Sequence, residues 1–354
     1  MLPNDRLAAL RIIDANFNRA MEGLRVLEEY CRFALEDAHL TRRWKDLRHE
    51  LATLHATLPP VDLLHARDTS GDIGTSVKTD QELSRDSLCH VAQASCKRLE
   101  QALRSLEEYA KFLGLAAPQL ESLRYQVYTL EKATLLTADS QRKLAGSQLY
   151  VLLDGSSPAE FESKAREICQ SGADIVQLRD KRLPDHEILD RAIMLRRISR
   201  ECDTLFIMND RPDLAVLSAA DGVHVGQDEL SIQNVRRIVG PEMLIGVSTH
   251  TIEQARQAVL SGASYIGCGP TFPSGTKHFD SFPGLAFLRE VAAEIGLPAF
   301  AIGGITRDNL KIVLQTGMQR VAVSGGVTQA ADPAAAVRGI RRRLFDASSN
   351  SNPG

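Results

Sequence analysis

The sequence predicts two parts: an all-α helical bundle over residues 1–140, then an α/β fold, a (β/α)8 TIM barrel, over residues 146–345. Three observations lead to this division. Apolar residues recur at helical spacing in the first part, and one stretch of that part occurs twice. In the second part, eight short apolar runs alternate with amphipathic stretches. We expect residues 346–354 to form a disordered tail.

The first part contains an internal repeat. Residues 19–33 (RAMEGLRVLEEYCRF) match residues 98–112 (RLEQALRSLEEYAKF) at a constant offset, and LEEY is identical in both. Two copies predict a pseudo-symmetric helical bundle whose shared core contains the leucines, tyrosines and phenylalanines of the repeat. Further helices are expected over residues 40–58 and 120–136.

Charged residues of the first part have two interpretations each. The loop at residues 67–75 is rich in Gly, Ser and Thr, and Arg67 could hold an anion there, although a solvated connection is the favoured interpretation. The repeated pairs, Arg25 with Glu28 and Arg104 with Glu107, could line a ligand site. Exposed ion pairs three residues apart are favoured instead.

Eight predicted strands organise the second part. Their apolar runs begin at Leu149, Ile175, Leu205, Gly222, Leu244, Tyr265, Ala299 and Val321. Helical stretches at 159–169, 186–200, 252–260, 285–295 and 308–315 separate most of them. A doubly wound open sheet is the alternative, but no GxGxxG motif follows the first strand, which disfavours a dinucleotide-binding fold.

Composition excludes several classes of function. The chain of 354 residues is 44% hydrophobic and 25% charged, with a formal net charge of -3, so no general attraction to nucleic acid or to an anionic membrane is expected. No apolar run is long enough to span a bilayer, and the N-terminal segment lacks a signal-peptide core. We therefore expect a cytoplasmic protein with small-molecule partners, which could form a homo-oligomer.

The active site of a TIM barrel lies at the carboxyl ends of its strands. The second strand ends in Gln177, Arg179 and Lys181, which alternate onto one face, and an amide with two cations at a barrel mouth suits a polyanion. Pairing of the two cations with nearby carboxylates is the alternative. The fifth strand ends in Ser248, whose hydroxyl can bind a polar substrate.

Acidic residues follow the third and fourth strands. Asp210 and the pair Asp228–Glu229 can share a divalent cation, and beside two basic residues this predicts Mg²⁺ bridging to a pyrophosphate. Asp210 could instead cap the helix that begins at Pro212. His224, in the middle of the fourth strand, is assigned a structural role.

Glycine-bearing turns follow the last strands. Gly303-Gly304 after the seventh strand and Ser324-Gly325-Gly326 after the eighth predict a phosphate cradle built from backbone N–H groups. The loop at 269–277, which carries Ser274, Thr276 and Lys277, is expected to act as a lid. Two anion sites are thus predicted, one for a metal-bridged pyrophosphate and one for a monophosphate.

Seven motifs in order resemble the thiamine-phosphate synthase family: QLRDK, MNDRPDLA, DGVHVGQDEL, IGVSTHT, YIGCGPTFPSGTK, AIGGIT and VAVSGG. The resemblance covers about 200 residues. It implies an Mg²⁺-assisted condensation of 4-amino-5-hydroxymethyl-2-methylpyrimidine pyrophosphate with 4-methyl-5-(2-phosphoethyl)thiazole, or its carboxylate. The products would be thiamine phosphate and pyrophosphate.

The resemblance also implies roles for individual residues. Asp210 and Glu229 would ligate Mg²⁺, and Arg179, Lys181 and Lys277 would be catalytic. The substrate-binding set would comprise Gln177, Leu178, Arg179, Asp180, Lys181, Asn209, Ser248, Ser274, Gly275, Thr276, Lys277, Gly304, Ser324 and Gly325.

This chain departs from the family pattern at three positions. The second metal position is usually Asp in the family and is Glu229 here, so either Asp228 or Glu229 could be the ligand. Ser274 stands where Thr is common, and a Val-Ser pair stands before the last glycines where Ile-Ser is common.

The mechanism implied by the resemblance is dissociative: pyrophosphate leaves a pyrimidine-methyl cation, which the thiazole nitrogen attacks. One alternative is a related thiazole-aromatising protein that lacks much of the pyrophosphate site. Another is a non-catalytic sensor of thiamine precursors. The intact set of cations and Asp210 favours the synthase. Helical extensions occur in some bacterial members, and this one could be regulatory, ligand-binding, dimerising or a scaffold.

Overall fold

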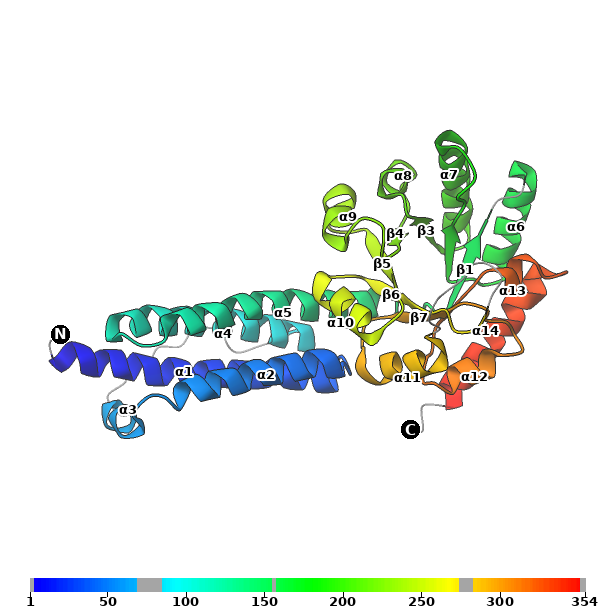
Figure 1. Ribbon diagram of the computed structural model, residues 1–354. Helices are drawn as coiled ribbons and strands as arrows, with labels where there is room; N and C mark the ends of the chain where they lie inside the picture. Colours follow the sequence, from blue (N-terminus) through cyan, green and yellow to red (C-terminus); the bar gives the residue numbers. More distant parts are fainter. Residues whose placement is uncertain (1–2, 69–84, 155–156, 274–282, 351–354) are drawn as a thin grey trace. The chain divides into compact units, whose positions relative to one another are not determined.

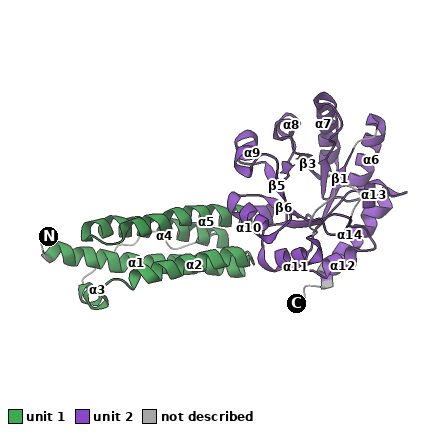
Figure 2. Cartoon of the chain, in the orientation of Figure 1, with its two compact units in different colours: residues 1–138 green, residues 139–354 purple. Residues whose placement is uncertain are grey.

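The computed structural model describes residues 3–68, 85–154, 157–273 and 283–350. The chain divides into two compact units, residues 1–138 and residues 139–354 (Figure 2). The division falls inside one continuous helix, α5. Each unit is described by itself below.

The first unit is helical (Figure 1). Its helices are α1 (Pro3–Phe33), α2 (Ala38–His55), α3 (Pro60–Ala66), α4 (Leu88–Leu113) and α5 (Ala117–Lys143). Side-chain caps define two of the starts: Asp37 accepts a hydrogen bond from the Leu40 N–H in α2, and Ser87 accepts one from the His90 N–H in α4. Gly114, in the left-handed conformation, ends α4.

Leucines of the repeated segments form part of the core of this unit, as predicted. Leu24 and Leu27 of α1 and Leu103 and Leu106 of α4 are buried. The prediction was wrong for the repeated phenylalanines. Phe33 and Phe112 are exposed because they lie in the last turns of α1 and α4, beyond the buried stretch of leucines.

The repeated glutamates also differ from the prediction of exposed ion pairs. Arg25 and Arg104 are exposed, but Glu28 and Glu107 are buried. Each glutamate is held from a neighbouring helix: Arg48 Nε of α2 lies 2.9 Å from Glu28 Oε2, and Arg124 Nε of α5 lies 3.1 Å from Glu107 Oε2. Burial is tolerated because the charge of each carboxylate is compensated within the unit.

Arg67 does not offer its guanidinium to an external anion. Its Nε and Nη2 atoms each donate to the Asp14 carboxylate at 2.7 Å, in a bidentate pair. This pair fixes the end of α3 against α1. The rest of the expected anion-binding loop, from residue 69 onward, lies outside the described residues.

The second unit is a closed parallel barrel, as predicted. Neighbouring strands pair in chain order, and the last strand closes onto the first. The strands are β1 (Leu149–Leu153), β2 (Ile175–Leu178), β3 (Leu205–Asn209), β4 (Gly222–Val225), β5 (Leu244–Thr249), β6 (Tyr265–Cys268), β7 (Ala299–Ile302) and β8 (Val321–Val323). All eight begin where the apolar runs begin.

Helices surround this barrel (Figure 1). They are α6 (Pro158–Gln170), α7 (Asp185–Glu201), α8 (Pro212–Leu217), α9 (Ile232–Val239), α10 (Ile252–Ser261), α11 (Gly284–Glu294), α12 (Leu310–Leu314), α13 (Gly325–Thr328) and α14 (Pro333–Asn350). The prediction of a disordered tail from residue 346 was wrong for 346–350, which continue α14. Val337, Ile340 and Leu344 anchor that helix by burial, and its last turns extend beyond them. Residues 351–354 lie outside the described residues.

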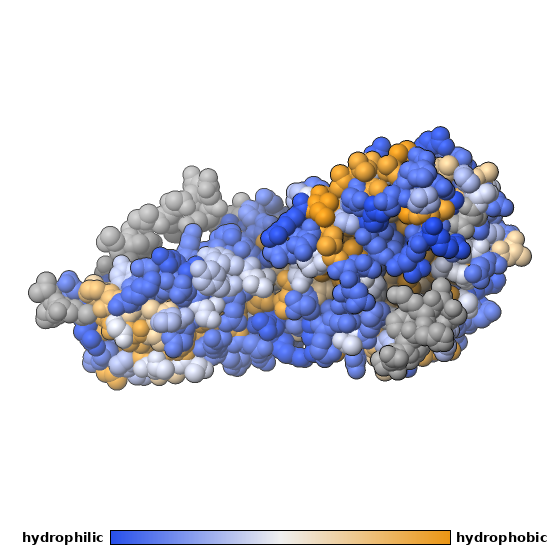
Figure 3. Space-filling view, turned by 45° about the horizontal axis from the view of Figure 1, so that its top comes forward, coloured by the Kyte–Doolittle hydropathy of each residue, from blue (hydrophilic) through white to orange (hydrophobic). Residues whose placement is uncertain are grey.

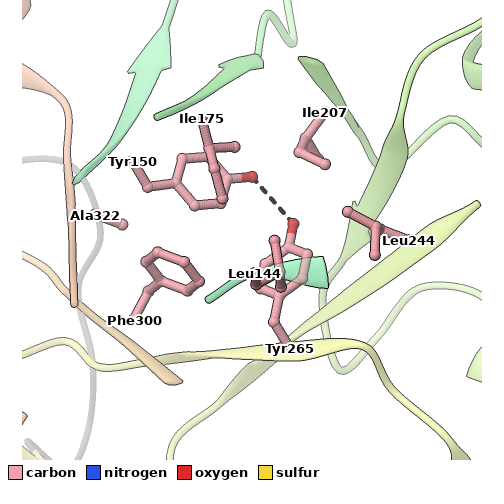
Figure 4. Packing of buried hydrophobic residues seen from close by; sticks show 8 residues of the cluster. All are labelled: Leu144, Tyr150, Ile175, Ile207, Leu244, Tyr265, Phe300 and Ala322. Carbon is pink, nitrogen blue, oxygen red and sulfur yellow. Dashed lines mark hydrogen bonds between the residues drawn. The ribbon is translucent and has the colours of Figure 1, made fainter. Parts of the chain in front are cut away.

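Aromatic and aliphatic side chains fill the barrel interior (Figure 4). Tyr150, Tyr265 and Phe300 pack with ring centroids 5.4 to 5.9 Å apart. Gly246 makes room for one of them: a Cβ atom there would lie 2.1 Å from Cζ of Tyr265. The Tyr265 ring of β6 therefore requires a residue without a side chain on β5.

The surface of the described residues is mostly hydrophilic on the face shown in Figure 3, with an apolar patch on the barrel unit. Large exposed apolar side chains of that unit include Val216, Leu217 and Ile238, on α8 and α9. Within the described ranges, no helix combines the length and apolarity needed to cross a membrane.

Candidate active site

Four polar side chains lie on the inner face of the barrel near the carboxyl ends of its strands. Gln177 lies two residues beyond Ile175, a member of the interior cluster, and so points to the same side. Asn209 bears the same relation to Ile207. Strand pairing places His224 beside Asn209 and opposite Gly246, and Ser248 lies two residues beyond Gly246 on β5, on the same face. The interior is thus apolar below and polar at the mouth.

A chain of hydrogen bonds joins the polar side chains to the two interior tyrosines. Gln177 Nε2 donates to Tyr150 Oη at 2.7 Å. The two tyrosine hydroxyls lie 3.1 Å apart, and Figure 4 marks the hydrogen bond between them with a dashed line. His224 Nδ1 lies 3.3 Å from Tyr265 Oη, and its Nε2 lies 3.0 Å from Ser248 Oγ. These hydrogen bonds therefore link Gln177 of β2 to Ser248 of β5.

Burial keeps this chain uncharged. Removal from water lowers the pKa of His224 to about 4, with a further lowering by the positive charge of Arg179 and an opposing effect of Asp210. Burial also raises the pKa of both Tyr150 and Tyr265 above the usual value for a phenol. At neutral pH the imidazole and both phenols are consequently neutral.

The neutral polar side chains of Gln177, Asn209, His224 and Ser248 form the floor of the barrel mouth. Charged residues that follow β2 and β3 lie above this floor, at the rim of the mouth. The main-chain N–H of Arg179 donates to Leu153 O at 2.8 Å, which extends the β1–β2 pairing past Leu178. Lys181 Nζ lies 2.9 Å from Asp210 Oδ2. The structure thus brings a residue that follows β2 together with one that follows β3, and this is also the carboxylate pairing considered as an alternative for Lys181.

Asp210 has a left-handed backbone, with φ of 60°. Its main-chain N–H donates to the carbonyl oxygen of His224 at 2.8 Å, which continues the β3–β4 pairing beyond the strand. An Asp at positive φ is uncommon, and this one is held by the ladder on one side and by Lys181 on the other. Asp210 is a rim residue, and the alternative that it caps α8 was wrong: Arg211 is at the N-cap of α8, without a side-chain cap hydrogen bond.

Two predicted substrate-binding residues have buried side chains. Leu178 alternates with Gln177 and is buried on the outer side of β2. The Asp180 carboxylate is buried, and its Oδ1 accepts a hydrogen bond from the Arg182 N–H at 2.9 Å. These positions can contribute to binding through their main chain.

The segment after β4 carries the second acidic pair. Asp228 and Glu229 are both exposed, and a Cβ atom on Gly226 would lie 3.4 Å from Cγ of Glu229. Gln227 Nε2 donates to Ser248 O at 2.5 Å and ties this segment to β5. In the ranges that the structure describes, no three His, Cys, Asp or Glu residues form a cluster suited to a metal ion.

The turns after β7 and β8 approach other backbone closely. Gly304 has φ of 65°, and a Cβ atom there would lie 2.9 Å from Cβ of Phe272. A Cβ atom on Gly326 would lie 2.8 Å from Ile305 O. A side chain is excluded at Gly304 and at Gly326, and Gly304, Ser324 and Gly325 are all at least partly exposed at the barrel surface. The remaining predicted residues, Ser274, Gly275, Thr276 and Lys277, lie outside the described residues.

Sequence reasoning missed the tyrosines beneath the mouth. Tyr150 and Tyr265 were read as parts of apolar runs, LYVLL and YIGC. A signal was available: a tyrosine buried in a strand needs a partner for its hydroxyl. Glycine at 246 of the neighbouring strand was a second signal of a large side chain crossing the interior.

Comparison with known proteins relates both units to described families. The thiamine monophosphate synthase family matches residues 149–327, and the ThiD2 family matches residues 11–133. A thiamine-phosphate synthase of Rhodopirellula baltica is 48% identical over 329 residues, covering 90% of this chain and 88% of its own. One of Gloeobacter violaceus is 40% identical, covering 95% and 96%.

A solved structure covers the barrel. Thiamine phosphate pyrophosphorylase from Pyrococcus furiosus aligns with a TM-score of 0.52 and 34% sequence identity, over 56% of this chain and 96% of that chain. The relatives from Rhodopirellula and Gloeobacter extend across both units, whereas the archaeal structure matches a length close to that of the barrel unit.

Proposed function

Because the chain belongs to the thiamine-phosphate synthase family, and is thus an enzyme of thiamine biosynthesis, we propose the following reaction for residues 146–345. The barrel condenses 4-amino-5-hydroxymethyl-2-methylpyrimidine pyrophosphate with the thiazole phosphate, or its carboxylate, and releases pyrophosphate. The observation that carries this proposal is the charged rim of Arg179, Lys181 and Asp210 above a neutral polar floor. A rim of that kind suits a diphosphate, and the floor suits a heterocycle.

The proposed pyrimidine pyrophosphate site follows this division between rim and floor. Gln177 and Ser248 of the floor bind the ring, and Asn209 lies between them on β3. Arg179 and Lys181 bind the diphosphate, with Lys277 from the loop after β6 as a third cation. Leu178 and Asp180 contribute main-chain groups. Guanidinium and ammonium groups are the side chains proteins use most for phosphate oxygens.

Asp210 and the acidic pair after β4 fit a magnesium ion that the substrate completes. Mg²⁺ commonly takes one or two protein carboxylates and fills its other positions with phosphate oxygens and water. Asp210 is the first proposed ligand, and Glu229, or Asp228 beside it, is the second. When bound there, Mg²⁺ supplies positive charge that stabilises the pyrophosphate leaving group.

The thiazole phosphate is assigned to the turns after β7 and β8. Gly304, Ser324 and Gly325 offer main-chain groups, and Phe272 and the Ile305 carbonyl leave no room for a side chain at Gly304 and at the adjacent Gly326. Ser274, Gly275 and Thr276 would complete the phosphate site from the loop after β6.

The reaction needs no side-chain nucleophile. Arg179, Lys181 and Lys277 stabilise negative charge as the bond between the pyrimidine methylene carbon and pyrophosphate breaks. The resulting pyrimidine-methyl cation is attacked by the thiazole nitrogen, which forms the new carbon–nitrogen bond. The residues therefore act by positioning and by electrostatic stabilisation.

Formation of thiamine phosphate by the purified full-length chain tests the proposal. The assay contains both substrates and Mg²⁺, and is repeated with EDTA. We expect product with Mg²⁺ and its loss with EDTA. Binding of both substrates by a folded chain without turnover would instead support a sensor of thiamine precursors.

We also propose that the helical unit contains two copies of a helical hairpin, α1–α2 and α4–α5. The sequence repeat lies in α1 and α4. The second helices share a shorter pattern, because Leu47-Arg48 of α2 corresponds to Leu123-Arg124 of α5. In both hairpins the arginine of the second helix pairs with the buried glutamate of the first. Equivalent charge pairs at equivalent places support a pseudo-two-fold repeat.

Self-association of the barrel unit is a further proposal. Val216, Leu217 and Ile238 expose apolar surface on two short helices, and apolar surface of this kind is commonly covered in oligomers. Sedimentation velocity of the full chain tests it. Loss of a dimer on substitution of Leu217 by Ser would support it, and a monomer in the unsubstituted chain would contradict it.

A further inference from the structure

The hydrogen-bonded chain beneath the mouth contains three residues to which the proposed reaction assigns no role: Tyr150, Tyr265 and His224. They join Gln177 to Ser248 without interruption, through contacts of 2.7, 3.1, 3.3 and 3.0 Å. The barrel encloses Tyr150 and Tyr265, and His224 is partly buried beside them. Their arrangement determines which hydrogen each hydroxyl and ring nitrogen can donate.

Glycines hold this chain in place. Gly246 lies against the Tyr265 ring, where a Cβ atom would overlap Cζ and Oη. Gly267 lies beside the imidazole, where a Cβ atom would be 3.3 Å from Cε1 of His224. The absence of a side chain at Gly246 and Gly267 therefore leaves the space that the two rings occupy.

Counting hydrogens gives the chain a direction. Tyr150 Oη accepts from Gln177 Nε2, so its own hydrogen is directed to Tyr265 Oη. Tyr265 then donates to His224 Nδ1, and the ring hydrogen resides on Nε2 and is donated to Ser248 Oγ. With Gln177 Nε2 directed at Tyr150, the reverse direction would leave the buried Tyr150 hydroxyl hydrogen without an acceptor in this chain, which is costly. The direction of the whole chain therefore depends on the orientation of the Gln177 amide.

This direction of the hydrogen bonds decides whether Gln177 and Ser248, at the two ends of the chain, offer a donor or an acceptor to a ligand. Gln177 commits Nε2 to Tyr150 and presents its Oε1 as an acceptor. Ser248 accepts from His224 and presents its hydroxyl hydrogen as a donor. A 4-aminopyrimidine carries the complementary pair, since its amino group donates and the adjacent ring nitrogen accepts. The 4-oxo analogue carries the opposite pair, an oxygen acceptor beside a ring N–H donor.

We propose that Tyr150, Tyr265 and His224 are positioning residues that make the site selective for a 4-aminopyrimidine over its 4-oxo analogue. The proposal rests on the proposed function, because it assumes that Gln177 and Ser248 face the pyrimidine ring. Tyr265 fixes the imidazole tautomer, and Tyr150 fixes the amide of Gln177. The selectivity of the site is thus set by residues that do not contact substrate themselves but orient Gln177 and Ser248, which do.

Two measurements test it. The first is ¹⁵N NMR of the histidine side chains in the full chain without substrate, which identifies the tautomer of His224 by comparison with His224→Gln. We expect hydrogen on Nε2. Hydrogen on Nδ1 would overturn the proposal. This readout is independent of turnover, so it stands apart from any failure of the proposed function.

The second measurement compares the amino and oxo pyrimidine pyrophosphates as substrates, through kcat/KM, and as ligands, by calorimetry. We expect a preference for the amino compound of about 100-fold or more, which Tyr265→Phe reduces about tenfold because the tautomer is no longer held. Tyr150→Phe removes only the hydroxyl that orients the Gln177 amide, so we expect it to reduce the preference for the amino compound less than Tyr265→Phe does. The matched control is Phe300→Leu, which alters the same cluster without removing a polar atom and leaves the preference unchanged.

An unchanged preference in folded Tyr265→Phe would overturn the proposal. Equal use of both pyrimidines by the unsubstituted chain would overturn it as well. If the unsubstituted chain binds neither pyrimidine and forms no thiamine phosphate, the proposed function fails, and the assignment of polarity to a pyrimidine fails with it. If Tyr265→Phe does not fold, the tautomer in the unsubstituted chain and the Tyr150→Phe preference decide the question.

Discussion

Both units bury polar groups, and they compensate them differently. In the helical unit, each buried carboxylate discussed above is closed off by basic residues: Glu107 contacts Lys111 and Arg124, and Glu28 contacts Arg48. In the barrel interior beneath the mouth, the side chains from Gln177 to Ser248 are neutral and form one chain, while Lys181 and Asp210 pair at the rim. In the helical unit, basic residues of the protein already neutralise these buried carboxylates, so a ligand is not needed there. In the barrel, hydrogen-bond donors, acceptors and cations lie at the mouth, where a ligand can contact them.

The difference shows that a buried charge is a poor marker of an active site. Glu107 has a lowered pKa because Lys111, Arg124 and Arg104 all favour its ionised form, and we infer that it serves stability. His224 has a lowered pKa because it is enclosed in a barrel mouth, and we infer that it serves binding. A structural site differs from a binding site in one respect: in a structural site, every buried polar group already has a partner within the protein.

The largest effect is expected from Gly246→Ala. The added Cβ atom would lie 2.1 Å from the enclosed Tyr265 ring, and the cost should be about 3 kcal/mol or more. Thermal denaturation followed by circular dichroism measures it. Gly146→Ala is the control, because nothing lies within 4 Å of its Cβ position. Equal melting temperatures for the two variants would show that the interior is more adaptable than its packing indicates.

Asp210→Asn and Lys181→Ala should leave the fold intact and lower kcat about 100-fold or more, because each removes a charge from the proposed diphosphate site. Asn tolerates the positive φ of position 210. Arg182→Ala serves as the control, since that side chain is exposed and adjacent. Rates within twofold of the parent chain would exclude these roles for Asp210 and Lys181.

Glu28→Gln and Glu107→Gln should each destabilise the helical unit by about 2 kcal/mol, without changing kcat of the folded enzyme. The folded state lowers the pKa of Glu107, so its contribution is present at neutral pH and is lost as the pH falls through that lowered value. Denaturant unfolding at neutral and acidic pH measures both. Glu108→Gln, at an exposed neighbour that contacts the same Lys111, should have a smaller effect.

The smallest effects compare helix caps in the two units. Ser87 caps α4 and Ser157 caps α6 within a capping box, so Ser87→Ala and Ser157→Ala should each cost about 1 kcal/mol. Neither should alter thiamine phosphate formation at temperatures where the chain is folded. A large loss of activity in either variant would show that function depends on local helix stability.

Much of the barrel could be predicted from the sequence because its signals are local. Apolar runs marked the starts of the eight strands, and Gln177 and Ser248 stood at strand ends, where such barrels carry function. The exposure of Phe33 and the burial of Glu28 could not be predicted in this way. Helical spacing defines a face, but the helix packed against that face decides which positions are covered.

The sequence by itself determined the order of elements, the closed parallel barrel, and the polar and glycine-bearing residues at its strand ends, because these depend on neighbours within a few residues. Tertiary structure alone decided the contacts of those residues. Tyr150 and Tyr265 are separated by 115 positions and meet only because the barrel closes. Arg48 pairs with Glu28, and Lys181 pairs with Asp210, across shorter distances in the sequence. These contacts too form only when the chain folds, because folding brings separate elements together.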